Sequence, residues 1–137
     1  MSDVPGRTTG RRLLFWAPVA VLLAVELWAS SRPPVLGHDE GQIPFPDKVA
    51  HLAYFGLVGF LAARAGREGE GWGAGRTLAV VAAGALLWGI SDEWHQSFTP
   101  GRDTEAADVA ADLLGALLGT AGREFLARFA ARRASPG

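Results

Sequence analysis

The stretch TLAVVAAGALLWGISDEWHQSFTPGR, residues 77–102, decides the fold. Its first part, up to Ile90, is apolar on every side and lacks the polar face of a helix on a soluble protein. Its second part, from Ser91, gathers two acids, a histidine, a glutamine and an arginine. A helix that crosses a bilayer here extends to about Trp94. The polar cluster then lies at the membrane edge, where ionisable groups are costly and usually functional.

Three further apolar segments flank this one, at residues 13–29, 49–65 and 106–127. The first of them carries Trp16 and Trp28 near its ends, and tryptophans are enriched at the two interfaces of a membrane. Apolar segments of about this length are typical of transmembrane helices. The sequence therefore predicts an all-α membrane protein with four transmembrane helices in an up-down bundle.

Two alternatives remain open. Arg11 and Arg12, the apolar run after them and the small residues Ala29 and Ser30 also fit a cleaved secretory signal, although three more apolar segments follow. A soluble four-helix bundle is the other alternative, and it is disfavoured because helices that are hydrophobic all round imply lipid or a large core. Proline and glycine predict irregular loops at residues 31–46 and 64–76.

Composition narrows the possible functions. The chain has 137 residues, 49% of them apolar, and a formal net charge of −1, which argues against nucleic acid as a partner. There is no cysteine, which excludes a disulfide framework and a thiolate nucleophile or metal ligand. The expected partner is the lipid bilayer, and the sequence leaves the oligomeric state open.

The distribution of positive charge predicts the orientation. Ten of the 13 lysines and arginines lie on one side if both termini are cytoplasmic, and only Arg32, Lys48 and Arg102 lie on the other. By the positive-inside rule, the chain is a multi-pass protein of the cytoplasmic (inner) membrane. We expect a cytoplasmic tail at residues 1–12, a four-helix membrane domain at 13–127 and a basic cytoplasmic tail at 128–137. The polar cluster then faces the periplasm or exterior.

This topology brings polar residues from three helices to one depth. On each helix they follow three- or four-residue spacing, so they form a stripe on one face. In the fourth helix the stripe continues into Gly115, Gly119 and Gly122, and small residues let neighbouring helices approach closely. The stripes are therefore expected to meet in one outward-opening cavity. The candidate binding residues are Asp47, Lys48, His51, Tyr54, Gln96, Arg102, Asp108 and Asp112.

Asp108 and Asp112 carry the most weight, because an unpaired carboxylate inside a membrane helix costs several kcal/mol. Lys48, His51 and Arg102 are the cations at the right depth, and a bound divalent cation is another possible partner. A purely structural ion-pair network remains the alternative. Less specific explanations also exist for single residues: Asp47 as a helix cap, Tyr54 as an interfacial aromatic, His95 as a group exposed to solvent or headgroups, and Glu26 as either a cavity residue or an interfacial one.

Several short motifs follow one another along the chain. They are Ser30-Ser31-x-Pro33, Asp47-Lys48-x-x-His51 with Tyr54, Asp92-Glu93-x-x-Gln96, Pro100-Gly101-Arg102, the pair Asp108 and Asp112, and the pair Gly115 and Gly119. Their order and spacing resemble the VanZ-like family of small membrane proteins, named for an accessory glycopeptide resistance protein. The resemblance covers most of residues 13–127. The sequence departs from the family pattern in two places: Tyr54 stands closer to His51, and Asp112 stands where the pattern has Asn.

The resemblance implies a role at the cell envelope, and a glycopeptide-resistance-type role rests on it alone. From the residues, the first hypothesis is a protein that binds an anionic lipid or wall precursor, with Arg102 and Lys48 holding phosphate or carboxylate. The alternative is an intramembrane hydrolase or transferase acting on a lipid-linked phosphate. Its candidate catalytic residues are Glu93, Asp92 and His51, with a divalent cation held by Asp108 and Asp112. Transport ranks last, because the charges gather at one face of the membrane.

Overall fold

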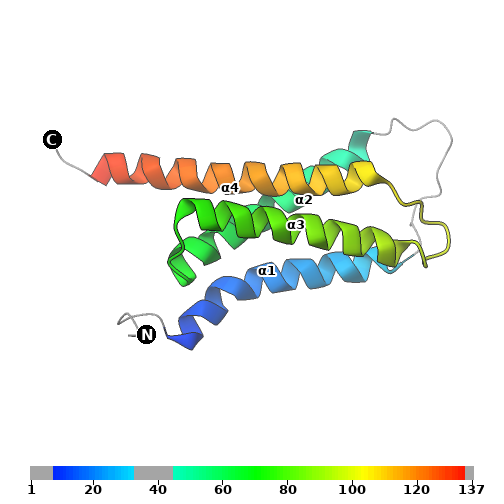
Figure 1. Ribbon diagram of the computed structural model, residues 1–137, viewed down its shortest axis with the longest axis horizontal. Coiled ribbons are helices and arrows are strands. Elements are labelled where there is room, and N and C mark those ends of the chain that lie inside the picture. The colour runs from blue at the N-terminus through cyan, green and yellow to red at the C-terminus, as the bar shows by residue number, and fades with distance from the viewer. Residues whose placement is uncertain (1–7, 33–44, 135–137) are drawn as a thin grey trace.

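Figure 1 shows the computed structural model, which describes residues 8–32 and 45–134, with the backbone alone at 45–47. Within these ranges every regular element is helical, as predicted. The predicted loop at residues 31–46 lies largely outside the described residues. The elements are α1 (Thr9–Ser30), α2 (Phe45–Arg64), the π-helical turn η1 (Ala65–Gly69), α3 (Ala74–Gln96) and α4 (Ala106–Ala134).

The four helices run alternately up and down, and the start of α1 lies at the same end as the end of α4 (Figure 1). The helices extend beyond several of the segments expected from the sequence. Thr8 caps α1 by accepting a hydrogen bond from the Arg11 amide at 3.4 Å, so the helix already includes part of the predicted tail. Most of the predicted loop at 64–76 is helical, because η1 continues α2 and α3 begins at Ala74. α4 passes the predicted end at residue 127 and protrudes beyond the other helices to Ala134.

Three of the helical segments are long and apolar enough to cross a membrane: Thr9–Ser30, Lys48–Gly69 and Ala74–Gln96. α4 does not reach this level, because Asp108, Asp112, Arg123 and Glu124 interrupt its apolar run. Large apolar side chains are exposed along the outer faces of the bundle, among them Leu14 on α1 and Leu87 on α3. The buried core is correspondingly thin, and Phe55 of α2 is its largest fully buried apolar side chain.

The closest helix contact is between α2 and α4, and glycine makes it possible. A Cβ atom added at Gly119 would lie 1.9 Å from the carbonyl oxygen of Gly56, and one added at Gly115 would lie 2.3 Å from that of Leu52. No side chain fits at such distances, so α4 presents Gly115 and Gly119 to α2, as their spacing predicts. The third glycine of the predicted stripe, Gly122, does not take part, since a Cβ atom added there would have nothing within 4 Å. Since Asp108 and Asp112 continue this stripe, they are carried toward α2 as well.

Candidate functional site

Six acidic residues gather at the end of the bundle where α1 and α3 finish and α4 begins, and we call this region the acidic end. They come from α1, α3, α4 and the residue before α4. Their placement brings most of the predicted site residues together at one end. The six are Glu26, Asp92, Glu93, Glu105, Asp108 and Asp112.

The two aspartates of α4 pair with cations on α2. Lys48 donates hydrogen bonds to Asp108 and, at 2.6 Å, to Glu105. His51 Nδ1 lies 2.8 Å from Asp112 Oδ1, and Asp112 is only 3% exposed. Pairing of this kind offsets the cost of holding carboxylates away from water. Two of the three cations expected from the sequence thus contact the α4 aspartates.

The third cation, Arg102, has a different position. Its guanidinium donates to the carbonyl oxygens of Arg32 at 3.2 Å and Ala29 at 3.3 Å, so it caps the carboxyl end of α1. The turn before it depends on Gly101, whose φ of 79° favours glycine. Among the residues that the structure describes, Arg102 contacts no carboxylate, and its positive charge is left without an anionic partner.

Asp92 is the centre of a buried hydrogen-bond network between α1 and α3. Ser30 Oγ donates to its Oδ1 at 2.6 Å, and the Gln96 amide donates to its Oδ2. All three side chains are buried, each 5% exposed. Ser30 was not among the predicted site residues. Two signals pointed to it: its position one turn after Glu26, the single acid of the first apolar segment, and the run Ser30-Ser31-x-Pro33, which resembles the family pattern.

A cavity of about 240 Å³ lies beside this network, between α1 and α2. Four of the predicted binding residues line it, together with Glu26, which the sequence left undecided between the cavity and the interface. Glu26 accepts a hydrogen bond from Trp88 Nε1 at 2.6 Å, and Tyr54 donates to the Leu22 carbonyl oxygen at 2.5 Å. The lining residues are Val25, Glu26, Ala29, Ser30, Ala50, His51, Tyr54, Phe55, Gln96 and Arg102.

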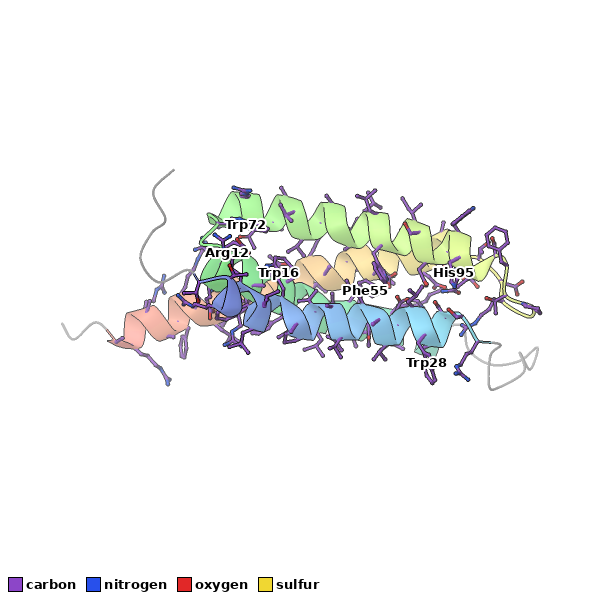
Figure 2. All side chains as sticks on the ribbon, turned by 90° about the horizontal axis from the view of Figure 1, so that it is seen from below. Arg12, Trp16, Trp28, Phe55, Trp72 and His95 are labelled. Atoms are coloured by element: carbon purple, nitrogen blue, oxygen red, sulfur yellow. The ribbon has the colours of Figure 1, made fainter. Side chains whose placement is uncertain are left out.

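Other candidates lie away from the cavity. Glu93 accepts a hydrogen bond from the backbone amide of Glu105 at 2.7 Å, so it closes the start of α4. His95 was expected to be exposed, but it is half-buried and bonds to Ser31 Oγ at 2.9 Å. Figure 2 shows it at the same end of the bundle as Trp28. The side chain of Asp47 lies outside the described residues.

The geometry therefore separates the three candidate catalytic residues. Asp92 is buried behind the cavity and bonded through both oxygens, Glu93 caps α4, and His51 alone reaches the cavity while bonded to Asp112. Among the described side chains no group of three His, Asp or Glu residues is placed to hold a metal ion. The arrangement is that of a cavity with apolar walls and a few polar groups, set into a bundle of membrane-length helices.

Helices of this length, with a buried acidic network at one end, define a small helical membrane protein. Residues 11–126 match the VanZ/LLP1 family model, and the chain therefore belongs to the VanZ/LLP1 family. The family resemblance of the motifs is thereby confirmed over most of the chain. No curated protein and no solved structure matches it.

Proposed function

We propose that the cavity at the acidic end binds the anionic headgroup of an envelope lipid or a lipid-linked wall precursor. The observation that carries the proposal is Arg102, whose guanidinium lines the cavity and bonds only to carbonyl oxygens in the described structure. A guanidinium is always charged and matches phosphate in geometry, so a phosphate group entering the cavity would find an unneutralised partner.

The proposal includes the topology expected from the sequence: four spans, both termini cytoplasmic, and the cavity at the outer face of the cytoplasmic membrane. This topology is supported by the arrangement of the helices, because the start of α1 and the end of α4 lie at the same end of the bundle (Figure 1). Most of the arginines belong to that side, which the positive-inside rule assigns to the cytoplasm. α4 is the charged span of the four. Its aspartates are paired with Lys48 and His51, which lowers the cost of their depth.

The walls of the cavity favour a lipid over a soluble anion. Val25 and Ala29 of α1 and Ala50 and Phe55 of α2 line it with apolar surface, while His51 and Gln96 add polar contacts deeper in the bundle. Trp28, 60% exposed on α1, projects from the same end, where an interfacial aromatic would sit at headgroup level (Figure 2). A headgroup in the cavity would leave its acyl chains in the surrounding bilayer.

The test is equilibrium binding of fluorescent lipids to the purified full chain in detergent. One probe is a short-chain phosphatidylglycerol and the other a polyprenyl phosphate, so that a glycerolipid is distinguished from a wall-precursor carrier. Arg102→Ala is expected to weaken binding of the preferred probe at least about tenfold, because hydrogen bonds to charged groups contribute about 1.5–3 kcal/mol.

The matched control is Arg76→Ala. Arg76 lies at the opposite end of the bundle, 4.9 Å from the ring centre of Trp72, and should leave the affinity unchanged. Equal affinity of the wild type and Arg102→Ala for both probes, with both proteins folded, would remove the proposal.

A further inference from the structure

The charges at the acidic end are not all balanced. Lys48 forms ion pairs with Asp108 and Glu105, and His51 pairs with Asp112. The remaining acids at the cavity and behind it lie beside each other and have no cationic partner among the described residues. These are Glu26, bonded to Trp88, and Asp92, bonded to Ser30 and Gln96.

Glu26 is the one of these two acids that lines the cavity. Asp92 lies behind it, 5% exposed, with a hydrogen bond to each of its oxygens. Glu26 accepts a hydrogen bond from Trp88 and lies beside the carboxyl group of Asp92, so two acids share this place without a cation. When ionised, Glu26 has about four acceptor sites, and on a membrane-length helix it is costly without a cation near it. The cavity therefore offers a cationic group a carboxyl for which the described chain supplies no counter-charge.

The positive charge of Arg102 lines the same cavity as Glu26. Arg102 bonds to the carbonyl oxygen of Ala29, which lies three residues after Glu26 on α1. Three residues of α-helix rise about 4.5 Å, so the two side chains meet the cavity about one helical turn apart. Arg102 and Glu26 both lack a partner of opposite charge in the described structure, and both face the same space.

We infer that the cavity selects a zwitterionic lipid headgroup, a phosphate ester with a primary ammonium, whose phosphate contacts Arg102 and whose ammonium contacts Glu26. The inference rests on the proposed function, because it assigns the second charge of the ligand bound there. An ammonium group donates three hydrogen bonds to separate acceptors, so it needs no compact set of ligands as a metal ion does.

Three lipid probes with identical acyl chains and fluorophore test this selectivity on the purified full chain. They are phosphatidylethanolamine, its N-acetyl derivative and phosphatidylglycerol, and only the first carries an ammonium. The wild type is expected to bind phosphatidylethanolamine at least about tenfold more tightly than the other two. Glu26→Gln keeps the size and an acceptor for Trp88 and removes the charge, so all three lipids should then bind with similar affinity.

Glu68→Gln, at the far end of the bundle, is the matched control and should keep the preference for the ammonium. Soluble phosphoethanolamine should compete at least about tenfold more weakly than the lipid, and equal competition would overturn the assignment to a lipid. A wild type without preference for the ammonium overturns the inference, even if Glu26→Gln does not fold. A preference that survives in folded Glu26→Gln overturns it too.

The outcomes separate this inference from the proposed function. If all three lipids bind equally and Arg102→Ala weakens each of them, the ammonium site is wrong and the anion site stands. If none of the lipids binds to the wild type, both are wrong.

Discussion

The two ends of the bundle differ in how their acidic side chains are paired with cations. Opposite the acidic end lies a region that we call the arginine end, formed by Arg12, Arg64, Arg67 and Arg123 with Glu68, Glu70 and Glu124. Every glutamate there contacts at least one arginine at 3.4 Å or less. At the acidic end, Glu26 and Asp92 lie beside each other, and neither contacts a cation within the described chain. A network in which every acid contacts a cation serves structure, whereas acids left without a cation leave a place for a ligand.

Aromatic side chains reinforce the arginine end. The Trp16 indole donates to Glu70 at 3.1 Å, and its ring lies 6.0 Å from that of Trp72. Figure 2 shows Arg12, Trp16 and Trp72 gathered there, with Phe55 midway along the bundle. A second cavity, of about 260 Å³, opens at this end beside Glu124. Its acid already has two arginine partners, so the cavity lacks the unpaired anion that distinguishes the first one.

The largest expected effect comes from a substitution that disturbs both ends of the bundle. Ion pairs join α2 to α4 at the acidic end and η1 to α4 at the arginine end, so moving α4 away from α2 weakens both sets. Gly119→Ala would place a Cβ atom 1.9 Å from the Gly56 carbonyl oxygen and force the two helices apart. We expect a loss of about 3 kcal/mol or more in the free energy of unfolding, at the upper end of overpacking effects. Thermal unfolding in detergent measures it.

Gly122→Ala is the matched control for that substitution. Nothing lies within 4 Å of a Cβ atom added at Gly122, so alanine should be neutral or stabilise the helix by up to about 1 kcal/mol. Equal melting temperatures for the two variants would show that the close contact between α2 and α4 does not form.

Removing one cation from each end gives the next effect. Lys48→Met leaves Asp108, 6% exposed, and Glu105 without this partner, and we expect a loss of about 2 kcal/mol or more. Arg64→Met should cost less than about 1 kcal/mol, since Arg64 is half-exposed and Glu68 keeps Arg123. Urea unfolding of both variants provides the comparison, and a larger loss for Arg64→Met would contradict it.

Much of the contact between α2 and α4 could be predicted from the sequence, because it depends on periodicity. The glycine stripe turns one face of α4 toward a neighbour, and the same period carries Asp108 and Asp112 to that face. Lys48 and His51 follow the same rule on α2. These residues meet because α2 and α4 run parallel, so residues near the start of each helix lie at the same depth (Figure 1).

The contribution of α1 could not be predicted in the same way. Its apolar run has no polar stripe, so nothing local shows that Glu26 faces Trp88 or that Ser30 reaches Asp92 across the bundle. The position of Arg102 depends on the geometry of the turn at Gly101. The spacing of residues in the sequence does not determine that geometry. The helix ends were placed too early because α4 continues through Arg128 and Arg132 among alanines, which are all strong helix formers.

The smallest expected effect compares the two indole hydrogen bonds, one at each end. Trp88→Phe removes the hydrogen bond at 2.6 Å to Glu26, which has no cation partner in the described chain, while Trp16→Phe removes one of two described contacts to Glu70, which keeps Arg12. A hydrogen bond contributes about 0.5–1.5 kcal/mol, up to about 3 kcal/mol when the acceptor is charged, and less where a cation remains. We therefore expect Trp88→Phe to cost about 1.5 kcal/mol in detergent and Trp16→Phe about 0.5 kcal/mol. Unfolding curves in the presence of phosphatidylethanolamine sharpen the comparison, because an ammonium on Glu26 would replace the lost donor and bring the two variants closer together. If Trp88→Phe lowers the free energy of unfolding no more than Trp16→Phe does without lipid, Glu26 depends on its indole donor no more than Glu70 does. The contrast between the two ends then does not hold.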